Sequence, residues 1–272
     1  MNESTPLVAS STINVLAACA TLCFVLPILL LVALKKNTRQ SLRGTFYGVI
    51  IYFSFTFGFQ QIFNMLFLLI DSPVSRFLGA NGICYCIYNA LVVAGCEETG
   101  RLIAFRFLKN EGTSDKRTSL MYGAGHGGAE CIMNGAFPLV TSLLFASTLN
   151  MHGYDAFIHS GGEETLETYI AYADSLMFTS AGMYLLSVVE RMICLAMQFA
   201  LSILMYEAVS YANKKLTLLT YIFHFVFALP ALLLSYYTEN AVAEAVAMGV
   251  ITAGIFAFAM IRYKKLSKTG GD

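Results

Sequence analysis

Long apolar stretches dominate this chain, and they recur at the length that a helix needs to cross a lipid bilayer. They lie at residues 11–34, 45–70, 77–108, 118–148, 176–212, 216–237 and 241–261. A helix rises about 1.5 Å per residue, so about 20 apolar residues span the hydrocarbon core. Only 12% of the residues are charged, against about a quarter in soluble domains. The sequence therefore predicts an all-α bundle of about seven transmembrane helices, in a multi-pass protein of the cell membrane.

The basic residues predict how these helices are oriented. Lysine and arginine concentrate in the cytoplasmic segments of membrane proteins. An outside N-terminus and a cytoplasmic C-terminus put every lysine and arginine in the cytoplasm except Arg76, outside, and Arg101 and Arg191, within spans. We expect one integral membrane domain over residues 1–272. Residues 149–175, which hold no lysine or arginine, would form an extracytoplasmic loop with an interfacial helix at 163–175.

Ionisable residues inside the apolar stretches are the second constraint. A charge near the middle of a bilayer costs at least about 2.5–3.5 kcal/mol on insertion scales, and such residues usually face an interior or a water-filled cavity. Left unpaired, the whole set would cost more than the stability of a typical domain, about 5–15 kcal/mol. We therefore expect these residues to be paired, solvated or neutral. They are Glu97, Glu98, Arg101, His126, Glu130, Glu190, Arg191 and His224.

Three of these residues are predicted to lie at nearly the same depth. Glu97 is 12 positions from Lys109, His126 is 9 from Arg117 and His224 is 9 from Lys215, each a basic residue at the cytoplasmic end of its span. At the rise of a helix these separations correspond to roughly 18, 14 and 14 Å. A carboxylate and two imidazoles from separate helices would thus share one level, which favours a common site.

The span at 176–212 carries two further polar positions. Gln198 lies 16 residues before Lys214, roughly 24 Å along a helix, and so approaches the level of the site. Glu190 lies 24 residues before Lys214, roughly 36 Å, and belongs near the outer face unless the span is broken. Because Glu190 and Arg191 are adjacent, they point to different faces, and we interpret them as structural.

The run EETGR contains two neighbouring acids and an arginine. Glu97 and Arg101 are four residues apart, so they share a helix face and can pair. This pair could be purely structural, but Glu98 then has no evident partner. Desolvation and a like-charged neighbour favour the protonated form of one acid, which would prepare it for acid–base chemistry. Intramembrane ionisable residues favour the functional interpretation.

The run GAGHGGAE surrounds a histidine with small residues. Its glycines are typical of close helix packing, with His126 as a satisfied buried residue. The functional alternative has the glycines admitting backbone or substrate to His126, while Glu130 fixes the tautomer of the ring. His224 stands alone in an apolar run, where a histidine is as often structural as functional, but its depth matches that of His126.

In their order along the chain, these motifs resemble those of glutamic-type intramembrane proteases. A glutamate pair closely followed by arginine, a histidine on the next span and a histidine on a later span are similar to the CAAX-processing and bacteriocin-processing enzymes. EETGR and GHGGAE are most similar to the YhfC family of membrane peptidases. The resemblance covers most of the chain in the order of its motifs and in the number of spans.

The resemblance implies a hydrolase, an intramembrane endopeptidase, with no cofactor. By analogy Glu97 would be the general base that activates a water molecule, although either glutamate of the pair is a candidate. His126 would orient the water, His224 would stabilise the oxyanion, and Arg101 would hold the acid pair. The substrate would be a membrane protein or peptide in the lipid bilayer. The zero net charge gives no indication of a nucleic-acid partner.

One position departs from the resemblance. The CAAX-type pattern has Asn or Asp four residues after its last histidine, where this chain has Ala228. One oxyanion donor is therefore missing or comes from elsewhere, and Gln198 is a candidate.

Two other functions remain open. A zinc enzyme could use Glu97 or Glu98 with His126 and His224 as a His₂Glu ligand set, although the chain has no HExxH motif. A non-catalytic transporter could use the same buried charges as an ion or proton path. The absence of an inverted repeat in the sequence counts against the transporter.

Overall fold

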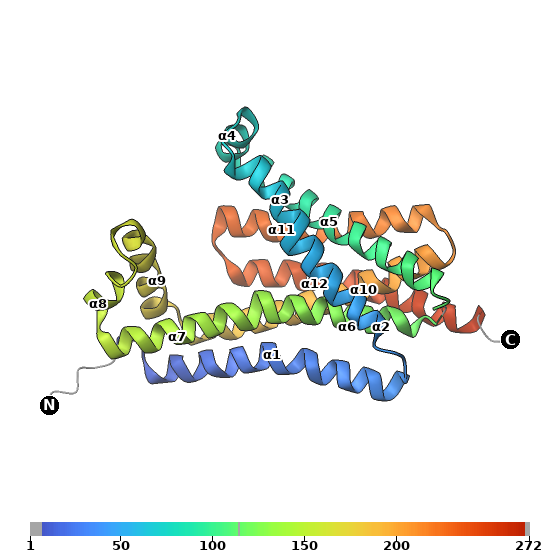
Figure 1. The fold of residues 1–272 in the computed structure, drawn as a ribbon, viewed down its shortest axis with the longest axis horizontal. Helices are drawn as coiled ribbons and strands as arrows, with labels where there is room; N and C mark the ends of the chain where they lie inside the picture. The colour runs from blue at the N-terminus through green and yellow to red at the C-terminus, as the bar shows by residue number, and fades with distance from the viewer. Residues whose placement is uncertain (1–6, 114, 270–272) are drawn as a thin grey trace. The chain divides into compact units, whose positions relative to one another are not determined.

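The computed structural model describes residues 7–113 and 115–269, which are helical over most of their length (Figure 1). The longest apolar helices are α1 (Ser10–Thr38), α5 (Gly82–Asn110), α10 (Ala181–Ser210), α11 (Lys214–Thr238) and α12 (Ala241–Thr269). Two further long helices are each made of several segments. The first consists of α2 (Arg43–Ile51), η1 (Tyr52–Phe59), α3 (Gln60–Asn64) and η2 (Met65–Leu69). The second consists of α6 (Arg117–Cys131), η3 (Ile132–Ala136) and α7 (Phe137–His152). The short elements are α4 (Pro73–Ala80), α8 (Tyr154–Ile158), η4 (Glu163–Thr165) and α9 (Leu166–Phe178).

The helices confirm the predicted fold class. In the described ranges, six are long and apolar enough to cross a membrane, and α4 with α5 makes a seventh if this bent pair is one span. The protein is thus an all-α, multi-pass membrane protein. Which end faces the cytoplasm stays a prediction.

The predicted spans differ from the helices where the chain bends. The stretch 77–108 contains a bend of 113° between α4 and α5, at Asn81, whose backbone is extended. A reciprocal capping box between Ser72 and Ser75 begins α4 and separates it from the preceding helix. The stretch 176–212 is also divided, because α9 ends at Phe178 and α10 begins at Ala181. From Ala181 to Ser210, α10 is unbroken.

The chain divides into two compact units. One takes the chain up to Leu26 together with Cys131–Arg191, and the other takes Pro27–Glu130 and the chain from Met192 onward. In the first unit, Phe145 of α7 packs edge-on against Phe157 of α8, with ring centroids 5.6 Å apart, and α9 packs on both helices. Helix α9 lies close to the range predicted for an interfacial helix, while its place at the membrane surface stays a prediction.

The core of the second unit forms around the second half of α10. Leu201 and Leu204 of α10 are fully buried in a cluster that also contains Phe105 of α5 and Tyr122 of α6. Helix α5 packs along α11, and α11 packs along α12 (Figure 1). This unit therefore holds α5, α6, α10 and α11 together at the level where the sequence places its buried ionisable residues.

Candidate active site

The buried acids of the site are carried by the middle of α5. Glu97, Glu98 and Arg101 are at most 4% exposed, although the helix is otherwise rich in apolar residues. Three polar side chains within two helical turns form one side of a polar site, because a buried charge is tolerated only where partners satisfy it. Those partners come from α6, α10 and α11.

Close helix approach brings His126 to this place. A Cβ added to Gly48 of α2 would lie 2.7 Å from the backbone nitrogen of His126, a distance that only glycine permits. A Cβ added to Gly127 would lie 2.8 Å from Leu195 of α10. The glycines around the histidine thus serve helix packing on two sides, and this packing also holds His126 fully buried against the edge of Tyr52.

One oxygen of Glu97 is the centre of the site. Its Oε2 atom lies 3.1 Å from Nε2 of His126, 3.0 Å from Nε2 of Gln198 and 3.9 Å from Nε2 of His224. Three helices thus present nitrogen atoms to a carboxylate from a fourth. The predicted meeting of Glu97, His126 and His224 is observed in the structure.

Glu98 is the partner of Arg101 and His224. Its Oε1 atom forms a buried ion pair with Arg101. The same atom accepts a hydrogen bond of 2.8 Å from Nδ1 of His224. The expectation that Arg101 pairs with Glu97 is therefore wrong. On a helix the third and the fourth neighbours are both within reach, and His224 and Gln198 select the arrangement with Glu98.

Gln198 connects the two halves of the site. Its side-chain oxygen accepts a hydrogen bond from Arg101, which fixes the orientation of the amide. Its nitrogen then donates to Oε2 of Glu97 and to Oε2 of Glu130, the latter at 2.7 Å. The position predicted for Gln198 from its depth is thus correct, and the contact found for Glu130 is with this amide.

Two aromatic residues of the site were not predicted from the sequence. The ring of Tyr122 stacks on His126 at 5.8 Å between centroids, and its hydroxyl lies 3.5 Å from Nδ1 of the histidine. Tyr52 meets the same ring edge-on at 5.5 Å. The spacing of four residues between Tyr122 and His126 could have indicated the first contact. No comparable signal exists for Tyr52, because it lies on a separate helix.

Two buried polar atoms of the site remain without a hydrogen-bond partner in the described part of the chain. They are Oε2 of Glu98 and Nε of Arg101. Such orphaned atoms are uncommon in native interiors, where most polar groups are satisfied by protein or water. The site therefore has capacity to bind water or another polar group.

A set of side chains in the site has the composition of a metal centre. Glu97, His126 and Glu130 each offer one ligand atom, and these atoms lie within 4.8 Å of one another. Carboxylate oxygen and imidazole nitrogen are common zinc ligands. In a tetrahedral zinc site, neighbouring ligand atoms are about 3.3 Å apart, close to the 3.1 Å between Glu97 and His126. The residues thus fit a divalent metal, and the expectation of no cofactor is not supported.

An apolar groove runs along a neighbouring face of α5, and neither Glu97 nor Glu98 lines it. It has a volume of about 610 Å³ between η1 and α5. Phe55, Phe59 and Phe63 line one wall, and Cys96 and Thr99, which flank the two glutamates in sequence, contribute to the other. The groove can therefore hold a hydrocarbon side chain against the same stretch of α5 that carries the two glutamates on its other faces.

Comparisons with known proteins identify the family of this chain. The chain is 26% identical over 255 residues to "Uncharacterized membrane protein YhfC" of Bacillus subtilis (strain 168), an alignment that covers 93% of this chain and 96% of that protein. No solved structure matches the chain. The model of a family described as "YhfC intramembrane metalloprotease" matches residues 22–252, which include every residue of the site. The chain therefore belongs to the YhfC family of intramembrane proteases.

Proposed function

We propose that this protein uses a divalent metal ion to hydrolyse a peptide bond of a substrate within the membrane. The observation that carries the proposal is the cluster of Glu97, His126 and Glu130, with three ligand atoms within 4.8 Å of one another inside a helical bundle. The description of the family as a metalloprotease family supports it. Glu97, His126 and Glu130 would hold the ion. When bound, the ion would supply a Lewis acid that polarises the peptide carbonyl and acidifies a water molecule.

Glu97 is better suited to bind a cation than to accept a proton. The amide of Gln198 donates to its Oε2 atom, and donated hydrogen bonds favour the ionised carboxylate. Arg101 holds that amide in place from the other side. The same amide reaches Glu130, so Gln198 spaces and orients the two carboxylates. We assign Gln198 and Arg101 the role of positioning residues.

His224 and Glu98 form a hydrogen-bonded pair that can move a proton. Glu98 accepts a hydrogen bond from Nδ1 of His224. In the neutral imidazole Nε2 then carries a lone pair, and this atom lies 3.9 Å from Oε2 of Glu97. In this position Nε2 can take a proton from the attacking water and return it to the leaving amine. The ion pair with Arg101 holds Glu98 in place, so Glu98 orients the imidazole of His224.

The apolar groove is where we place the substrate. A membrane-spanning segment would lay its side chains along the three phenylalanines, and its backbone would reach Glu97 by passing around α5 from the face of Cys96 and Thr99. Excluding bulk water from such a site strengthens each electrostatic interaction within it.

A leucine in the groove should interfere with the substrate alone. A Cβ at Gly95 meets no heavy atom within 4 Å, so Gly95→Leu enters the groove without a clash. We expect kcat/KM for membrane-spanning substrates to fall about tenfold, while the bound metal stays unchanged. Gly254→Leu on α12, where a Cβ also meets nothing within 4 Å, is the matched control and should leave kcat/KM unaltered. Equal values for the two variants would exclude this groove as the substrate path.

A second mechanism is favoured by the direct contact of Glu97 with His126. At 3.1 Å these side chains satisfy one another without an ion. In this alternative Glu97 is the general base for a water molecule oriented by His126, His224 stabilises the oxyanion, and the peptidase is metal-independent. The two mechanisms use the same residues and differ in what a chelator does.

Metal content and cleavage, measured together, test the proposal. The full chain would be purified in detergent, its metals quantified by elemental mass spectrometry, and cleavage followed on a panel of single-span membrane peptides. We expect about one zinc-like divalent ion per chain, loss of cleavage after chelation and recovery on addition of Zn²⁺. Undiminished cleavage by metal-free protein would instead support the glutamate mechanism. A protein that binds no metal and cleaves none of the peptides would overturn both.

A further inference from the structure

A second polar cavity lies at the end of the helices, apart from the acids of the site. Its volume is about 360 Å³, and it lies where α5 ends at Asn110, α10 ends at Ser210 and α11 begins at Lys214. This volume is within the range of small-molecule sites. Its charged lining residues are Arg106, Lys109 and Lys214, and no carboxylate contributes to the lining.

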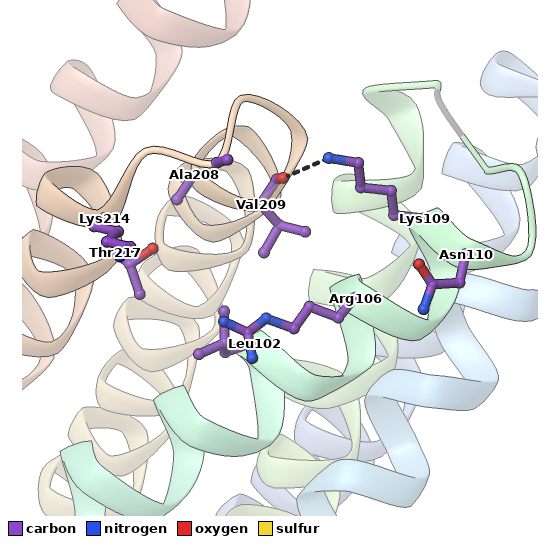
Figure 2. Close-up of a pocket in the computed structure, with 9 residues that line it drawn as sticks. Leu102, Arg106, Lys109, Asn110, Ala208, Val209, Lys214 and Thr217 are labelled. Atoms are coloured by element: carbon purple, nitrogen blue, oxygen red, sulfur yellow. Dashed lines mark hydrogen bonds between the residues drawn. The ribbon is translucent and has the colours of Figure 1, made fainter.

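Figure 2 shows how these cations are arranged. Lys109 extends from α5 toward Val209 at the end of α10, and Arg106 extends from α5 below Val209 in this view, while Lys214 and Thr217 lie on the opposite side, on α11. Nζ of Lys109 donates to the backbone oxygens of Val209 and Ser210, 3.0 Å from each (Figure 2 draws the first). Its charge is thus anchored by carbonyl groups and is not neutralised.

The other two cations also lack an acidic partner. Within the described ranges, neither Arg106 nor Lys214 forms an ion pair, and both side chains are exposed. Two other exposed or half-exposed cations of this unit do have such partners, since Arg117 pairs with Asp115 and Arg262 with Glu207. The cavity is thus surrounded by three positive charges that no carboxylate neutralises, and such an arrangement attracts an anion.

The backbone of α11 adds to this attraction. The helix has 25 residues, and its N-terminus, capped by Asn213, borders the cavity near Lys214 and Thr217. The partial positive charge at a helix N-terminus favours anions, phosphate groups in particular. The hydroxyl of Thr217 donates to the backbone oxygen of Asn213, 3.2 Å away, so it can only accept a hydrogen bond from a ligand.

We propose that this cavity binds a phosphate group, carried by either an anionic phospholipid or a free phosphate compound. Its position at the ends of membrane-spanning helices is the level of lipid headgroups, and basic pockets between such helices recognise anionic headgroups. Arg106 supplies a planar fork for two phosphate oxygens, and the lysines supply point charges. The proposal does not depend on the peptidase mechanism.

Binding to the full-length protein in detergent tests the proposal. Native mass spectrometry would measure the dissociation constants for phosphatidylglycerol and phosphatidylcholine, and a thermal-shift titration would measure inorganic phosphate. Arg106→Gln with Lys214→Gln removes two cations of the cavity. Arg43→Gln with Lys215→Gln is the matched control, because it removes one arginine and one lysine that are also exposed but do not line the cavity.

The cavity variant is expected to bind its phosphate ligand about 25-fold more weakly, about fivefold for each cation. The control should lose less than about threefold, because exposed charges at a distance are screened. Preference for phosphatidylglycerol identifies a lipid headgroup as the ligand, and saturable protection by inorganic phosphate identifies a free phosphate compound. Equal losses in the two variants, or wild-type protein that does not distinguish phosphatidylglycerol from phosphatidylcholine and ignores phosphate, would overturn the proposal.

Discussion

Replacing Glu97 by glutamine is expected to remove the bound metal and to lower kcat by about a thousandfold or more. The substitution keeps the shape of the side chain and replaces an anionic carboxylate ligand by a neutral amide, which is a far weaker ligand for a divalent ion. Loss of the ion withdraws several kcal/mol of transition-state stabilisation, and each 1.4 kcal/mol corresponds to about tenfold in rate. Metal content and single-turnover cleavage, measured on the same preparation, check both parts of the prediction.

Glu98→Gln is the informative companion of this variant, because it changes the neighbouring acid in the same way. Glu98 binds Arg101 and His224 and is not in the cluster proposed to hold the ion. We expect Glu98→Gln to retain the metal and to lose about 10²–10⁴ in kcat, the usual contribution of general acid–base catalysis. The same result is expected for His224→Gln.

A third carboxylate serves as the control for the loss of charge alone. Glu207 is 8% exposed and pairs with Arg262, well outside the cluster. Glu207→Gln should keep both the metal and the activity. If Glu97→Gln keeps its metal while activity is lost, Glu97 is a proton acceptor and not a ligand, and the effect of a chelator on the wild-type protein then decides whether the metal takes part in the reaction. Wild-type activity in Glu97→Gln would remove Glu97 from the reaction altogether.

The sequence predicts the helices well because the membrane imposes a simple geometry. Helices in a bilayer run across it, so distance along the chain measures depth. That is why the meeting of Glu97, His126 and His224 could be predicted from their distances along the chain to basic residues at the ends of their spans. The same reasoning located Gln198.

The features that the sequence did not predict are contacts and bends for which two arrangements of the chain have similar energies. Arg101 can reach either acid of the pair, and only contacts from α10 and α11 decide for Glu98. The bend at Asn81 lies in a stretch that is longer than one span needs, and length alone did not distinguish a break from a tilt or an extension past the membrane. The role of Glu130 depended on Gln198, which is 68 residues further along the chain.

The metal was the other point that the sequence could not decide. Its ligands come from two helices without the HExxH spacing, and a carboxylate near an imidazole can bind an ion or hold a water molecule. The distances between the ligand atoms favour a metal only because a third donor, Glu130, lies beside Glu97 and His126.

Arg101→Met is expected to destabilise the protein by about 3–5 kcal/mol, the largest effect on folding that we predict for a single side chain. The guanidinium is fully buried, pairs with Glu98 and donates to Gln198. Removing it leaves a buried carboxylate without its counter-charge, and that desolvated charge is the origin of the cost. Methionine fills much of the same space, so the loss of packing adds little. Reversible unfolding in mixed micelles measures the free energy.

The reference for this variant is Arg117→Met, because Arg117 pairs with Asp115 at a half-exposed position. An exposed pair is screened by water, and its loss should cost about 0–1 kcal/mol. Arg117 also holds the pKa of Asp115 below its ordinary value, so this small contribution is present near neutral pH and disappears as the pH falls through the lowered pKa.

A double-mutant cycle then identifies the source of the larger cost. Glu98→Gln removes the charge that Arg101→Met leaves uncompensated, so the double variant should be less destabilised than the sum of the two single variants. A coupling of about 1–3 kcal/mol is expected for residues in direct contact. Additive effects would show that Arg101 stabilises the bundle through packing alone. In that case the orientation of His224 would have to come from Glu98 without its arginine, and the proton-transfer role proposed for the pair would lose its structural support.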